Sequence, residues 1–82
     1  MTNAQTFNTI EIVRNDLPTM SEARILEAYN SAKRSIDALR GIMKTHATDS
    51  AEYKNCLDTI DQYNKLCKEC FVAAIALRES VQ

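Results

Sequence analysis

The residues best suited to chemistry are two cysteines spaced Cys67-x-x-Cys70 and the single histidine, His46. A structural zinc site needs four ligands, usually supplied as two close pairs of Cys or His. If the intervening segments are helical, Cys56 lies about 16 Å and His46 about 30 Å from Cys67 along the chain. One chain cannot gather these groups, so we expect no metal and no other cofactor.

Redox and acid–base chemistry are also disfavoured by position. A redox pair works best at a helix N-terminus, where the thiol pKa is lowered, whereas Cys67 and Cys70 fall inside a long apolar pattern. We therefore expect both thiols to pack between helices. His46 lies at the C-terminal end of a predicted helix, where it would cap or pack. No glycine-rich phosphate loop or serine elbow accompanies it, so the sequence predicts a protein that is not an enzyme.

Three basic side chains, Lys33, Arg34 and Arg40, are the candidates for binding a small anion such as a nucleotide, at a subunit interface. The other interpretation is a solvated or ion-paired helix face. The chain as a whole has a net charge of -1, whereas proteins that bind nucleic acid usually carry a basic excess. Nucleic acid is therefore not an expected partner.

Two long apolar patterns predict the elements that carry these residues. The apolar residues recur at alternating steps of three and four, which is typical of helices that pack along one seam. The first seam consists of Ile25, Tyr29, Ala32, Ile36, Leu39 and Met43. The second consists of Tyr53, Cys56, Ile60, Tyr63, Cys67, Cys70, Ala74, Leu77 and Val81. A short connection between them predicts an antiparallel helical hairpin.

Capping patterns set the expected ends of these helices. Thr19, followed three residues later by Glu22, matches a capping box, and it predicts a first long helix over residues 19–46. Asp49 is the expected N-cap of the second, over residues 49–81. If the chain folds back near residues 47–48, Ile25 faces Cys70 and Phe71, and Tyr29 faces Cys67.

The N-terminal segment has a weaker pattern. Phe7, Ile10, Val13 and Leu17 follow helical steps and predict a short helix over residues 8–16, with Asn8 as its cap. A strand is the alternative, because "TIEIV" partly alternates. The fold class is thus all-α, a coiled-coil-like hairpin with a short N-terminal helix in a single domain over residues 1–82. A core this small favours self-association.

The stretch "CKECFVAAIAL" leaves a second apolar face beside the seam, formed by Leu26, Phe71, Val72 and Ile75. Three interpretations are open: the N-terminal helix covers it, another copy or another protein binds it, or it rests on a membrane surface. The few flanking basic residues disfavour the last. We expect a protein-binding site there, extended by Phe7, Ile10 and Val13.

The length of the chain and its targeting features limit the expected domain organisation and cellular location. The chain has 82 residues and one Gly and one Pro, which suits one helical domain. Its first residues lack the basic and apolar regions of a secretion signal, and no apolar stretch approaches the roughly 20 residues that span a bilayer. We expect a cytoplasmic protein that is not inserted in a membrane.

In size and composition the chain resembles the small helical accessory proteins of large bacteriophages. These include inhibitors of host defence and the cytoplasmic lysis-inhibition factor of T-even phages. The resemblance rests on no specific motif, so no site residue follows from it. It implies a regulator or inhibitor of another protein, acting in the host cytoplasm.

Overall fold

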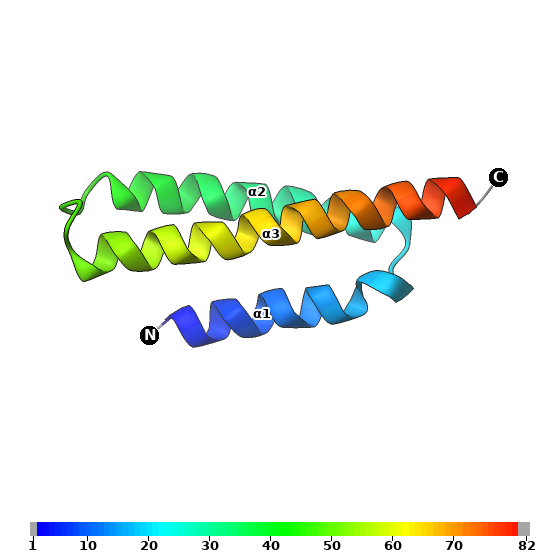
Figure 1. The fold of residues 1–82 in the computed structure, drawn as a ribbon, viewed down its shortest axis with the longest axis horizontal. Coiled ribbons are helices and arrows are strands. Elements are labelled where there is room, and N and C mark those ends of the chain that lie inside the picture. Colours follow the sequence, from blue (N-terminus) through cyan, green and yellow to red (C-terminus); the bar gives the residue numbers. More distant parts are fainter. Residues whose placement is uncertain (1, 81–82) are drawn as a thin grey trace.

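The computed structural model describes the backbone of residues 2–80 and the side chains of residues 9–80. Within residues 2–80 it contains helices and no strand: α1 (Thr2–Asp16), a 3-10 turn η1 (Leu17–Thr19), α2 (Glu22–Met43) and α3 (Ala51–Ser80). The helices α2 and α3 lie side by side and run in opposite directions, with α1 packed on α3 (Figure 1). The predicted all-helical class with three helices is therefore confirmed.

The start of α2 differs from the sequence prediction. Its N-cap is Ser21, whose hydroxyl accepts a hydrogen bond from the Arg24 N–H at 3.3 Å. Thr19 instead ends the 3-10 turn, and its hydroxyl donates to the Asp16 carbonyl at 2.9 Å. The predicted capping box of Thr19 and Glu22 is therefore wrong, because the turn engages the threonine before the helix begins.

The other helix ends also shift. The helix α2 ends at Met43 rather than 46, and the His46 N–H donates to the Met43 carbonyl in a turn. Ser50, not Asp49, is the N-cap of α3, since its hydroxyl accepts a hydrogen bond from the Tyr53 N–H at 3.1 Å. The first helix is longer than residues 8–16 and starts at Thr2, so Asn8 is not its cap and the strand alternative is wrong.

The core lies where the three helices meet. Its most buried residues are Ile10, Leu17, Ile25, Ala32, Leu66 and Cys70. The seam residues of α2 and α3 are buried or half-buried throughout the described chain. Full burial of one Leu or Ile side chain stabilises the fold by about 1.5–3 kcal/mol, so this cluster accounts for much of the cohesion of a small domain.

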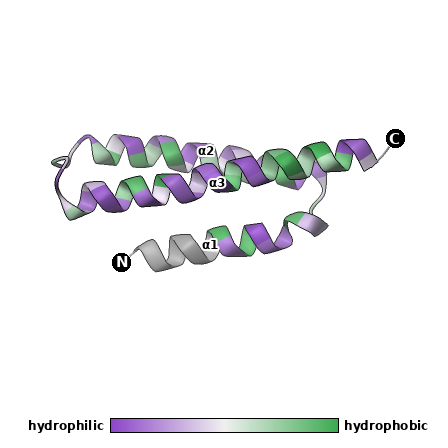
Figure 2. Cartoon of the chain, viewed as in Figure 1, coloured by the Kyte–Doolittle hydropathy of each residue, from purple (hydrophilic) through white to green (hydrophobic). Residues whose placement is uncertain are grey.

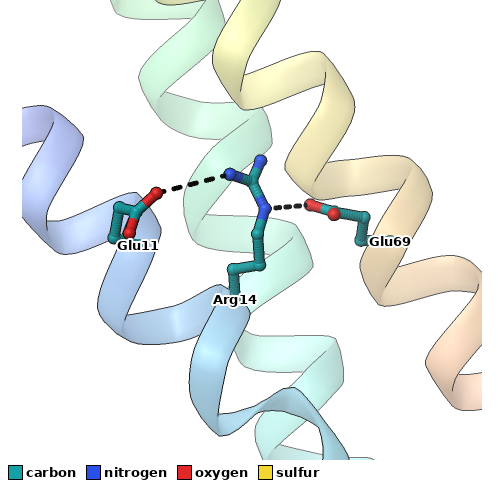
Figure 3. Close-up of polar contacts among 3 residues, drawn as sticks. All are labelled: Glu11, Arg14 and Glu69. Carbon is teal, nitrogen blue, oxygen red and sulfur yellow. Dashed lines mark hydrogen bonds and ion pairs between the residues drawn. The ribbon is translucent and has the colours of Figure 1, made fainter.

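A narrow cavity and one ion pair lie where α1 meets the other helices. On α2, Ala28, Ser31, Ala32 and Ser35 line a narrow cavity of about 80 Å³ together with residues of α1 and α3. The Arg14 Nε lies 2.7 Å from the Glu69 Oε1 of α3, and a second Arg14 nitrogen lies 4.0 Å from Glu11 (Figure 3). The pair fastens α1 to one side of α3.

Candidate protein-binding face

Four large apolar side chains form an exposed patch on the side of α2 and α3, here called the apolar face: Leu26, Phe71, Val72 and Ile75. Phe71 is 61% and Val72 65% exposed, against 45% for Leu26 and 39% for Ile75. The C-terminal half of α3 is its most hydrophobic part (Figure 2). Contiguous apolar surface of this kind is uncommon on a monomer and typically marks an interaction site.

The N-terminal helix does not cover this face. Glu69, which pairs with Arg14 of α1, precedes Phe71 by two residues. At 100° per residue the two side chains are about 200° apart around α3. The interpretation in which the N-terminal helix shields Phe71 and Ile75 is therefore wrong, because α1 packs on the opposite side of α3.

The apolar face is hollowed where α2 meets α3. A pocket of about 230 Å³ is lined by Ile25, Leu26, Tyr29, Cys70, Phe71 and Ala74. A shallower groove beside it is lined by Tyr29, Cys67, Lys68, Phe71 and Val72. These linings bring Ile25 near Cys70 and Tyr29 near Cys67, which is compatible with the pairing expected from the sequence. A hollow flanked by protruding apolar side chains suits an inserted side chain.

Two of the three N-terminal residues assigned to the same site lie elsewhere. Ile10 is 2% exposed and belongs to the core, so it is not available to a partner. Val13 is half-buried and packs against that core. Phe7 lies outside the described side chains. The extension of the binding site onto α1 is thus wrong for Ile10, because this side chain is buried against residues of α2 and α3.

Cys67 and Cys70 pack in or against the core. Cys70 is fully buried in the core cluster, and Cys67 is packed against it. Burial raises the pKa of both thiols, and the nearby Lys33 lowers that of Cys67 only in part. A raised pKa disfavours the nucleophilic thiolate. Among the described residues no group of His, Cys, Asp and Glu is placed to hold a metal ion.

The basic candidates remain on the surface of α2. Lys33, Arg34 and Arg40 are exposed, and none of them forms an ion pair with a described residue. The Lys33 ammonium lies 5.7 Å from the centre of the Tyr29 ring, at the rim of the apolar face. None of the three lines the pocket or the groove described above. His46 is half-buried in the connection between α2 and α3.

Comparison with known proteins found no match. No family model matches it, no curated protein is similar to it, and no solved structure resembles it. In the part of the chain that is described, no helix has the length and apolar character needed to cross a membrane.

Proposed function

We propose that this protein is a non-enzymatic interaction module that binds another protein chain through the apolar face and thereby regulates or inhibits it. The observation that supports this is the exposure of Phe71 and Val72 beside a preformed pocket. Aromatic side chains next to a pocket are frequent centres of binding energy. An antiparallel coiled-coil-like hairpin presents them on a rigid surface, and the protein self-associates in the cytoplasm.

The surroundings of the face support binding rather than catalysis. The nearby thiols have raised pKa values, and the pocket lining is almost entirely apolar. A reaction centre needs convergent polar groups with suitable pKa values. The resemblance in size and composition to phage accessory proteins favours a regulator or inhibitor among the possible binding roles.

Affinity capture with matched variants tests this proposal. We expect Phe71→Asp to abolish capture of a specific protein, because a carboxylate cannot be buried in an apolar contact. Ile12→Asp is the control, since Ile12 on α1 is also 61% exposed and should capture like the wild type. The captured protein is then purified, and its affinity and activity are measured with each variant.

The proposal fails if the reconstituted pair binds equally well to wild type and Phe71→Asp while circular dichroism shows both variants folded. It also fails in its regulatory part if binding leaves the activity of the purified target unchanged. Direct titration distinguishes these results, because affinity and activity are read separately on the same pair.

A second candidate function is the binding of a small anion by Lys33, Arg34 and Arg40. These residues are exposed and form no ion pair within the described chain. A nucleotide bound by the folded state alone raises the melting temperature with its concentration. Melting curves with ATP, inorganic phosphate and sulfate, repeated on Arg34→Glu and Arg40→Glu, test it; no shift in the wild type contradicts it.

A further inference from the structure

We infer that a second copy of this chain occupies the apolar face, with the α3 helices of the two copies antiparallel and crossing near Ala73. The inference rests on the proposed function, because it takes the same face as a protein-binding surface and names its partner. The two copies are related by a two-fold axis, so each contact occurs twice.

The apolar residues of α3 are spaced for self-pairing. In an antiparallel pair that crosses at residue 73, positions whose numbers are equally distant from 73 lie at the same height. Phe71 of one copy then meets Ile75 of the other, large against branched, and the reverse contact is identical. Both side chains are exposed in the single chain. Leu26 borders the pocket beneath Phe71 and supplies the adjoining surface on α2.

The positions of the charged residues that flank the apolar face indicate nearly the same crossing point as the apolar residues do. Lys68 precedes the apolar residues and Glu79 follows them. Their midpoint is within half a residue of Ala73, so an antiparallel copy that crosses there places each lysine level with the partner's Arg78 and about 1.5 Å from the level of the partner's Glu79. Within one chain the two side chains are 11 residues apart, about 16 Å along the helix, and neither forms an ion pair with a described residue.

The parallel arrangement is disfavoured by these same charges. It would place Lys68 against Lys68 and Glu79 against Glu79, and like charges across an interface are destabilising. Arg78, next to Glu79, is already directed to the other helix, because its guanidinium lies 3.2 Å from the Glu22 carboxylate of α2. The residue left to meet Lys68 is therefore Glu79.

The exposed area is sufficient for such a dimer. The chain exposes 5858 Å², whereas a globular monomer of 9.3 kDa exposes about 5,000 Å². The chain therefore has about 900 Å² more surface than a compact monomer of its mass, and an interface of standard size buries roughly 800 Å² per partner. The excess arises from the slender shape, 50 × 20 × 15 Å, which a second copy alongside would thicken.

Solution mass tests the inference. Light scattering coupled to size exclusion should give twice 9.3 kDa for the wild type, with dissociation on dilution. Phe71→Asp should elute as a folded monomer, and Ile12→Asp, equally exposed on α1, should remain dimeric. A wild type that stays monomeric at all concentrations overturns the inference, as does a dimer that persists in Phe71→Asp.

Charge reversal tests the antiparallel register separately. Lys68→Glu and Glu79→Lys should each weaken the dimer roughly tenfold, since attraction becomes repulsion at two symmetric places. The double variant, Lys68→Glu with Glu79→Lys, should recover wild-type affinity, because the opposite pair is restored between copies. No recovery overturns the register. Melting of each variant as a dilute monomer controls for folding.

These outcomes separate the two proposals. If the wild type is a monomer and Phe71→Asp still abolishes binding of a purified target, the second copy is excluded and the proposed function stands. If the wild type is a dimer and a purified target binds Phe71→Asp and the wild type equally, the inference stands and the target site lies elsewhere.

Discussion

The two sides of α3 carry apolar residues of similar character, but one side is buried and the other is exposed. One side carries Leu66, which is 3% exposed beneath α1, and the other carries Phe71, which is 61% exposed. The sides differ in the charges beside them. Glu69 lies on the covered side and receives Arg14, whereas Lys68 lies beside the apolar face. On the covered side α1 can therefore pair Arg14 with Glu69, whereas on the other side the same arginine would meet Lys68.

The comparison also shows how a small domain divides its apolar surface. Burying one side of α3 under α1 stabilises the single chain, while leaving the other side open costs stability that the fold could have gained. A chain of 82 residues has little stability to spare. An exposed patch that persists under this constraint is more readily explained by a partner than by incomplete folding.

The largest expected difference between the two sides of α3 is in unfolding free energy, and truncating one apolar side chain on each side measures it. We expect Leu66→Ala to lower the free energy of unfolding by about 3 kcal/mol, because it leaves a cavity in the core. Val72→Ala, at a side chain that is 65% exposed, should change it by less than about 0.5 kcal/mol. Urea unfolding at protein concentrations low enough to prevent association measures both. Equal losses would mean that the two sides are not energetically distinct.

A second, smaller effect concerns the thiols at the boundary of the two sides. Burial raises the pKa of Cys67 and Cys70 above the ordinary value of 9.0, so folding favours the protonated thiol. This contribution to stability is complete below pH 9.0 and is lost as the pH rises through the folded-state pKa values. We expect unfolding free energy to decrease above that pH.

The control for the thiols is the double variant Cys67→Ala with Cys70→Ala, because lysines and tyrosines titrate in the same range. The wild type should lose stability more steeply with rising pH than this variant does, as measured by urea unfolding at a series of alkaline pH values. Parallel pH profiles for the two proteins would contradict the expected role of burial.

Much of this fold follows from the spacing of residues along the chain. The alternating steps of three and four identify two long helices, and the seam residues they contain are buried or half-buried in the structure. The starts of α2 and α3 are each displaced by one or two residues, because Ser21 and Ser50 cap the helices in place of Thr19 and Asp49. Neighbouring hydroxyl and carboxylate residues offer equivalent caps, and only backbone geometry selects among them.

The packing of α1 was not predictable from apolar periodicity. Leu66, a buried contact for α1, lies just outside the predicted seam of α3, and the same helix offers Phe71 and Ile75 on its other side. Because α3 carries apolar residues on both sides, periodicity alone does not predict the side on which α1 packs. The charges in the sequence do carry a signal for the side. Arg14, next to Val13 of α1, complements Glu69 and would be repelled by Lys68.

The coupling free energy of the ion pair between Arg14 and Glu69 tests whether charge distinguishes the two sides of α3. A double-mutant cycle with Arg14→Met and Glu69→Gln should give a coupling free energy of about 0.5–1 kcal/mol, because both side chains are partly exposed and screened by water. The matched control is Asp61 with Lys65, a pair on α3 itself at 3.4 Å and more exposed, for which about 0.3 kcal/mol is expected.

If the coupling between Arg14 and Glu69 equals that of the control pair, the ion pair does not select the side of α3 on which α1 packs. The small side chains of α2 must then do so by shape alone. If the coupling exceeds the control, one arginine directs α1 away from Phe71. The same residue would then both stabilise the core and keep the apolar face open, since α1 cannot satisfy its charge on the side where Lys68 lies.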